Sequence, residues 1–236
     1  MSTPTPLTDD FKRLALIIGL TPEHCEVYLR DFMTFLSCKQ AGAWKPEEMV
    51  LLCNPGRATI IEELDRHGPL DQLMMIYSGN CYIPSGDELM IQLGERGVSL
   101  KSFYNEAPRQ IFIVEDCRTP LASPSLSEQL LLVPKPGRKN IELLYRKKIS
   151  ASHPGTSVIS AAKSDMPHKL SGHPTLLNIL VKNVIHWASH PIAKPILSIK
   201  IAQQIASLEK RSDFRFVPSP TQRQRRIIKY PPLAVL

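Results

Sequence analysis

The sequence lacks the features that mark membrane and secreted proteins. Its longest apolar runs, such as residues 14–19, fall far short of the roughly 20 residues that a membrane-spanning helix needs. The first ten residues are polar and end in two aspartates, so no secretory signal is predicted there. We therefore expect a cytoplasmic protein without a membrane partner, with a flexible N-terminus over residues 1–10.

Cysteine is scarce and widely spaced. The five cysteines form no Cys-x-x-Cys pair, which argues against a zinc site or a redox motif. We therefore expect no metal and no cofactor, and in a reducing compartment we expect free thiols. A disulfide between Cys81 and Cys117 is an alternative if the loops that carry them meet.

Acidic residues are outnumbered, because 29 Lys and Arg face 22 Asp and Glu, giving a net charge of +7. Much of the excess lies in residues 135–148 and 223–229. A basic balance suits nucleic acid or an acidic partner, but no nucleic-acid module signature accompanies it here. A solvated basic surface is the simpler interpretation, so we expect no nucleic-acid partner. A nucleic-acid-associated regulator stays as a weaker hypothesis, which strong salt dependence would mark.

Short apolar runs alternate with amphipathic segments along the chain. This alternation predicts an α/β fold with a mainly parallel sheet and helices on both faces. No internal repeat is found, so residues 1–236 are predicted to form a single domain. Strands are predicted at 13–19, 49–53, 72–77, 110–114 and 156–161, and helices at 23–38, 58–64, 99–106, 174–189 and 196–208.

Three stretches interrupt the alternation. Residues 78–98 are predicted as a loop, since Pro84, Gly86 and Gly94 are breakers. Residues 118–155 hold five prolines and are predicted as a long loop region, of a length that is usually functional or disordered. Residues 223–236 are predicted as a basic C-terminal edge strand, because tandem prolines suit a sheet edge.

Two polar segments follow neighbouring predicted strands, at the carboxyl ends where parallel sheets gather function. Residues 77–81 read Tyr-Ser-Gly-Asn-Cys, and residues 115–118 read Glu-Asp-Cys-Arg. These segments resemble the caspase and metacaspase family of cysteine peptidases, particularly its short bacterial-type members. In that family the first segment reads Tyr/Phe-Ser-Gly-His-Gly and supplies the general base, and the second supplies the nucleophilic cysteine. The resemblance aligns Asn80 with the base and Cys117 with the nucleophile.

The resemblance extends over nearly the whole chain. Residues 15–19 are similar to the first strand of the family, and residues 156–162 to the strand that borders its substrate pocket. Residues 171–177 are similar to the start of the next helix, and residues 230–233 to the closing segment. The resemblance implies a caspase-like three-layer sandwich with a sheet of about six strands.

The largest departure from the family pattern is Asn80, which stands in place of histidine. A cysteine peptidase needs a thiolate, and an adjacent His⁺ lowers the thiol pKa and then protonates the leaving amine. Asparagine cannot titrate, and losing a general acid–base typically costs about 10²–10⁴ in rate. The resemblance with this departure implies a catalytically impaired homologue, a pseudo-caspase that binds a protein or peptide partner.

An active cysteine endopeptidase that uses Cys117 with a substitute base is the alternative. His153, His168 and His173 are the candidates for that base, although each is more readily explained as an ordinary surface histidine. Arg118 favours this alternative, because its charge would stabilise a thiolate.

The resemblance also indicates where substrate would bind. In metacaspase-like members, acidic groups near the nucleophile accept Lys or Arg, a role that Glu115, Asp116 and Asp165 would fill here. Ser160 belongs to the strand that resembles the border of the substrate pocket. A homo-oligomer formed through the C-terminal edge strand is a further expectation.

Overall fold

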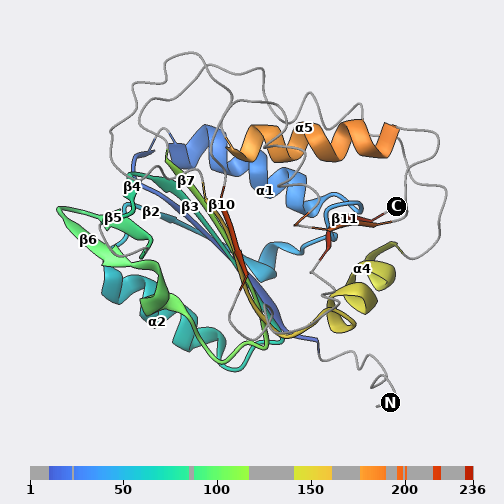
Figure 1. Ribbon diagram of the computed structural model, residues 1–236, viewed down its shortest axis with the longest axis horizontal. Coiled ribbons are helices and arrows are strands. Elements are labelled where there is room, and N and C mark those ends of the chain that lie inside the picture. The colour runs from blue at the N-terminus through green and yellow to red at the C-terminus, as the bar shows by residue number, and fades with distance from the viewer. Residues whose placement is uncertain are drawn as a thin grey trace.

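The centre of the fold is a six-stranded sheet of order β10-β8-β7-β3-β1-β2 (Figure 1). The structure is a computed structural model that describes residues 11–22, 24–84, 88–116, 141–160, 176–189, 196–198, 200, 215–218 and 232–235. Five strands are parallel, and β10 pairs antiparallel with β8 at one edge. The strands are β1 (Arg13–Gly19), β2 (Met49–Cys53), β3 (Gln72–Gly79), β7 (Arg109–Asp116), β8 (Gly155–Ser160) and β10 (Arg215–Pro218).

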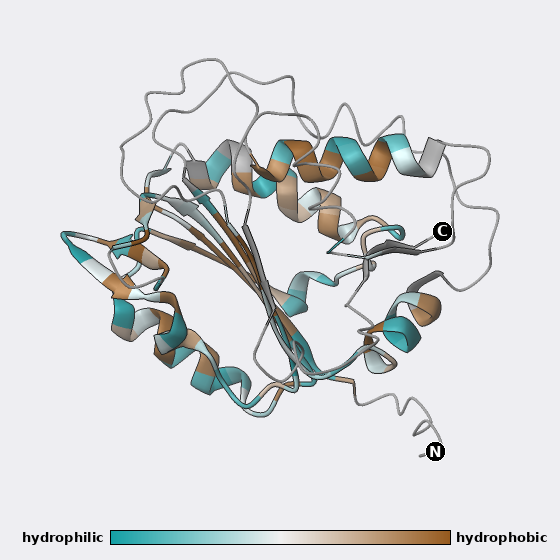
Figure 2. Cartoon of the chain, in the orientation of Figure 1, coloured by the Kyte–Doolittle hydropathy of each residue, from teal (hydrophilic) through white to brown (hydrophobic). Residues whose placement is uncertain are grey.

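Helices cover both faces of this sheet and so make three layers (Figure 1). One face carries α5 (Leu176–Ser189) and α1 (Arg30–Ser37), which continues a π-helix, η1 (His24–Leu29); the other carries α2 (Arg57–His67). Along β1, Ala15 and Ile17 join the core under α1 and α5, and Leu16 joins the opposite core. Figure 2 shows the apolar strands enclosed between the helices. The predicted α/β fold with a mainly parallel sheet and helices on both faces is confirmed.

The predicted loop over residues 78–98 holds a small antiparallel sheet instead. Its strands are β4 (Cys81–Tyr82), β5 (Met90–Leu93) and β6 (Arg96–Ser99), and they begin two residues after β3 ends. Gly94 has a φ of +60° in the turn between β5 and β6, so this residue makes a tight hairpin there instead of ending the structure. The helix predicted from Ser99 is a 3₁₀ helix, η3 (Leu100–Phe103), and the Ser99 hydroxyl accepts a hydrogen bond from the Lys101 backbone N–H at 3.2 Å.

The long irregular loop predicted over residues 118–155 is wrong for its second half. Residues 141–150 form a helix, α4 (Ile141–Ser150), whereas residues 117–140 lie outside the described part of the chain. Tyr145 and Ile149 are fully buried, and because they are four residues apart they share one face of α4. Burial raises the pKa of Tyr145 to about 12, although the nearby positive charge of Arg13 lowers it in part.

The C-terminal predictions also need correction. Residues 196–198, predicted as the start of a helix, form strand β9 (Ile196–Ser198), which follows Pro195 and opens on a β-branched residue. Within the predicted edge strand 223–236, residues 232–235 form β11 (Pro232–Val235), which pairs with β9 in a separate two-stranded sheet. Strand β10 takes the edge of the main sheet instead, and the predicted oligomer contact through residues 223–236 stays a prediction.

A buried polar network holds α4 at the amino ends of the strands. Arg13 of β1 is 3% exposed, and its guanidinium lies 4.4 Å from the ring centroid of Trp44. One guanidinium nitrogen donates to the Gly42 carbonyl at 2.9 Å, and the other lies 2.7 Å from Glu48, at the end of a 3₁₀ helix, η2 (Pro46–Glu48). Arg146 of α4 contacts the same carboxylate at 3.4 Å. Burial raises the pKa of Glu48, but hydrogen bonds to Arg13 and Lys45 and nearby cationic charge outweigh it and hold the pKa below its usual range.

Candidate functional site

Two of the predicted site positions follow neighbouring strands in register. Gly79 of β3 and Asp116 of β7 are partner residues in the parallel ladder, so their backbones are about 4.8 Å apart. Asn80 follows the first of these residues and Cys117 follows the second. Cys117 itself lies outside the described residues, so the register fixes the place where its strand ends and nothing beyond it.

Gly79 is required by close packing at the end of β3. A Cβ at this position would lie 2.6 Å from the Leu20 side chain and 2.6 Å from the Tyr77 hydroxyl. Both groups are near the carboxyl edge of the sheet, where β1 and β3 end together. The Ser-Gly pair before Asn80 therefore has a steric reason in this chain, independent of any chemistry.

The carboxamide of Asn80 is tied to the small sheet. Its Nδ2 donates to Gln92 Oε1 at 3.0 Å, and Gln92 Nε2 donates in turn to the Gly94 carbonyl at 3.1 Å. The Gln92 backbone N–H donates to the Asn80 carbonyl at 2.9 Å. The Tyr77 hydroxyl lies 3.0 Å from the Asn80 carbonyl oxygen and 2.7 Å from the Gln92 carbonyl oxygen. Asn80 is thus positioned by hydrogen bonds that an amide can make without titrating.

Gln92 is the site residue that sequence reasoning missed. It lies in β5, where Ile91 and Leu93 are buried and Met90 and Gln92 are partly exposed. This alternation of apolar and half-exposed residues is the strand signal that could have located it. The breakers around residues 84–94 obscured that signal.

Glu115, one residue before Asp116, has a structural role at this edge. Its side chain is 1% exposed, and its two carboxylate oxygens accept hydrogen bonds from the Ser78 hydroxyl and from the Leu177 backbone N–H, each at 3.3 Å. Leu177 is in the first described turn of α5, where a carboxylate suits both the N–H groups and the helix dipole. Glu115 therefore joins the ends of β3 and β7 to α5.

The predicted substrate-binding residues are only partly placed by the structure. Asp116 and Ser160 are the last residues of β7 and β8, so these two and Asn80 come together at the carboxyl edge of three adjacent strands. Ser160 is 3% exposed, which leaves little of it open to a ligand. The side chain of Asp116 and all of Asp165 lie outside the described residues, so their predicted role is untested.

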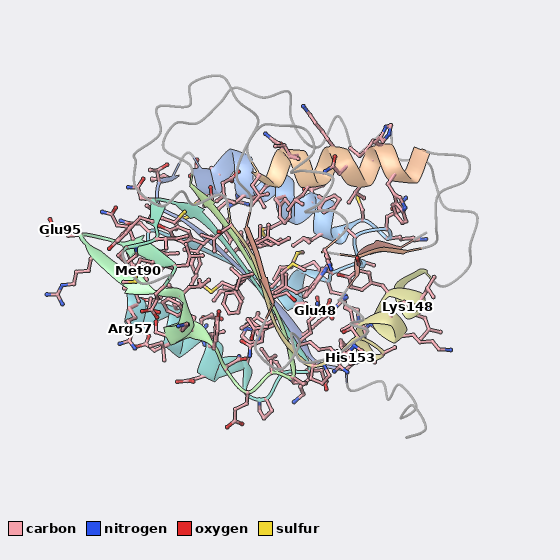
Figure 3. The ribbon with its side chains drawn as sticks, in the orientation of Figure 1. Glu48, Arg57, Met90, Glu95, Lys148 and His153 are labelled. Carbon is pink, nitrogen blue, oxygen red and sulfur yellow. A yellow bond between two sulfur atoms is a disulfide. The ribbon has the colours of Figure 1, made fainter. Side chains whose placement is uncertain are left out.

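The structure removes His153 as a substitute base for Cys117. His153 precedes β8, whose Gly155 pairs with Arg109 at the amino end of β7. Because β7 rises about 3.3 Å per residue, His153 is more than about 20 Å from Asp116. Figure 3 shows His153 beside α4, at the far side of the molecule from Met90 and Glu95 in the small sheet.

The remaining histidines divide into two groups. His67 closes α2 before the amino end of β3 and lies 3.3 Å from Glu63, and His186 is exposed about 14 Å along α5 from Leu177. Neither is at the carboxyl edge. Three histidines, His168, His173 and His190, lie outside the described residues. The side chain of His24, which begins η1, is also outside them.

The cysteines differ from expectation. Cys25 of η1 and Cys53 of β2 form a disulfide with a Cα–Cα distance of 5.9 Å, so the prediction of free thiols is wrong for this pair. Cys38 and Cys81 are thiols, and burial raises the pKa of Cys38. The Cys81–Cys117 alternative is untested, because Cys117 is not described.

Comparison with known proteins gives no relative to set beside this geometry. No protein-family model matches the chain, and none of the curated proteins matches it either. The described ranges contain no cluster of three or more His, Cys, Asp or Glu side chains that could hold a metal ion. No helix in those ranges has the length and apolar content to cross a membrane.

Proposed function

We propose that this chain is a catalytically impaired, caspase-like protein that acts by binding a protein or peptide at the carboxyl edge of its sheet. The observation that carries the proposal is Asn80. This residue aligns with the general base of the caspase and metacaspase family, and its side chain donates a hydrogen bond to Gln92. The sheet order supports it, because β3 and β7, which lead to Asn80 and Cys117, are adjacent and in register.

The chemistry of this edge favours binding over turnover. Acyl transfer to a cysteine needs a group that first takes a proton and then returns it to the leaving amine. The Asn80 carboxamide cannot do either, but it can still donate and accept hydrogen bonds to an extended peptide. A site that keeps the strand ends and lacks the base would therefore hold a peptide with little cleavage.

An active cysteine endopeptidase remains the second candidate, because Cys117 follows β7 directly and stands beside Arg118. Of the three bases predicted for it, His153 is too far from the end of β7. His168 and His173 are the ones left to support that candidate.

The pH dependence of Cys117 alkylation by iodoacetamide tests the proposal. Without an imidazolium neighbour, the rate should follow one titration near the ordinary thiol pKa of about 8.5. Cys38 in the same sample is the internal reference, and it should react more slowly because burial raises its pKa. The rates are read from the alkylated peptides by mass spectrometry, so each thiol is followed separately.

A Cys117 that is already largely thiolate at pH 5–6 in both the native chain and Arg118→Gln would contradict the proposal, since a histidine would then be the neighbour that lowers its pKa. The variants His168→Ala and His173→Ala would then identify the group responsible. Alkylation of Cys117 in Arg118→Gln separates the effect of the arginine charge from that of a histidine.

A further inference from the structure

The Cys25–Cys53 disulfide lies on the same edge of the sheet as Asn80. Cys53 of β2 pairs with Gly19 of β1, and Gly19 pairs with Ser78 of β3. Neighbouring strands are about 4.8 Å apart, so the backbones of Cys53 and Ser78 are separated by about 10 Å along this edge. The disulfide is therefore close to the strand end that leads into Asn80.

The two bridged residues differ in their access to solvent. Cys25 is fully buried, whereas Cys53 is exposed at the end of an edge strand. Thiol–disulfide exchange needs an attacking thiolate to reach one sulfur atom in line, and the exposed Cys53 offers that access. A dissolved thiol can thus reduce this bond without unfolding the core.

Cys25 belongs to the π-helix η1, a rare form that is often found at functional sites. Its Sγ lies 2.7 Å, and a Leu29 methyl lies 2.8 Å, from the point where a Cβ of Gly19 would stand. Glycine at position 19 therefore lets η1 pack directly on the end of β1. The position of η1 and the end of β1 are coupled by this contact.

The coupling continues from β1 to β3 through one side chain. Leu20 follows Gly19 and fills the space over Gly79, where a Cβ would meet it at 2.6 Å. Gly79 precedes Asn80 directly. A shift of η1 that moves Gly19 and Leu20 consequently acts on the backbone that carries Asn80, across two packed contacts.

We propose that Cys25 and Cys53 form a reversible redox site that controls the order of the carboxyl edge at Asn80. A thiolate of a dithiol reductant attacks the sulfur of the exposed residue Cys53, and Cys25 leaves as a thiolate that takes up a proton. The second thiol of the reductant then attacks its own mixed-disulfide sulfur and releases Cys53, also as a thiol. The protein gains two electrons and two protons, and the reductant becomes a cyclic disulfide.

Reduction frees η1 from β2. The packing of Leu20 against Gly79, which positions the backbone of Asn80, then loses the support of the disulfide. The sequence separation of the bridged cysteines is 28 residues, so the bond constrains a sizeable loop. This inference does not depend on the function proposed for Asn80, because it concerns the order of the backbone and not the chemistry of position 80.

Hydrogen exchange of the full chain, before and after dithiothreitol, tests the redox site. We expect a Cys25–Cys53 linked peptide in the oxidised protein. After reduction, amides in residues 24–29 and 78–82 should exchange about tenfold faster or more, while those in β7 and β8 keep their protection. Oxidised dithiothreitol should restore the original rates. Cys53→Ser should show the fast rates without reductant, whereas Cys38→Ser should respond as the native chain does.

Two results would overturn the redox site. One is the absence of a Cys25–Cys53 linked peptide in the oxidised, folded protein. The other is a reduction effect confined to residues 24–29, with residues 78–82 unchanged in both the reduced native chain and Cys53→Ser. Alkylation of Cys117 is measured separately, so a failure here leaves the proposed function standing, and the reverse also holds.

Discussion

Asn80→His is expected to raise peptide hydrolysis by about 10²–10⁴ over the native chain, the range that a positioned general acid–base supplies. In histidine, Nδ1 is bonded to Cγ, just as Nδ2 is in asparagine. An Nδ1–H at position 80 would therefore replace the Asn80 Nδ2 donor to Gln92 Oε1, which lies 3.0 Å away. That hydrogen bond fixes the tautomer and leaves Nε2 free to accept a proton from Cys117. The measurement is kcat/KM on fluorogenic peptides with Arg, Lys or Asp before the scissile bond.

Matched variants separate this gain from a change in folding. Asn80→Gln introduces no titrating group, so its activity should equal that of the native chain. Adding Cys117→Ala to Asn80→His should abolish the gain, and adding Gln92→Ala should reduce it, because the imidazole then loses its acceptor. A well-folded Asn80→His protein without any gain would show that position 80 does not face the thiol.

Glu48→Ala is expected to lower the free energy of unfolding by about 3 kcal/mol, the lower end of the range for removing one partner of a buried ion pair. The change leaves Arg13, whose side chain has no exposed surface, without its carboxylate partner at 2.7 Å. It also removes the contact from Arg146, so α4 should loosen. Urea denaturation followed by circular dichroism measures the loss. The lower end of the range applies because the Glu48 side chain is 13% exposed.

Glu47→Ala is the matched control, because Glu47 is the exposed neighbour in the same 3₁₀ helix. It should change the free energy of unfolding by no more than about 0.5 kcal/mol. The free energy of unfolding of Glu48→Gln, compared with that of the native chain as a function of pH, tests the contribution of the Glu48 charge. Because the folded state lowers the pKa of Glu48, the stabilisation is present above the unfolded pKa of about 4.3 and is lost as the pH falls. Equal losses in Glu47→Ala and Glu48→Ala would contradict the network.

The parallel strands could be predicted because each is a short apolar run that both faces bury. In β1, residues 14–18 are all fully buried, which requires the continuous run that the sequence shows. The small sheet was missed because its strands are only two to four residues long and lie among the breakers Pro84, Gly86 and Gly94. Helix α4 was missed because prolines before and after it suggested an irregular segment.

The candidate site was predictable only where it depends on chain order. Asn80 was located from residues 77–81, and its strand partner from residues 115–118, because parallel strands end at one edge. The contacts of Asn80 with Gln92 and of Glu115 with Leu177 join residues 12 and 62 positions apart, which no local pattern encodes. The Cys25–Cys53 pairing was missed for the same reason, since spacing alone does not reveal which cysteines meet.

The most direct test of the proposed function is hydrolysis of fluorogenic peptides by the native chain, measured beside Cys117→Ala. We predict that the two proteins release product at the same background rate, because Asn80 offers Cys117 no base. Turnover by the native chain that disappears in Cys117→Ala would contradict the proposal, and it would show that this protein is an active peptidase with its base elsewhere.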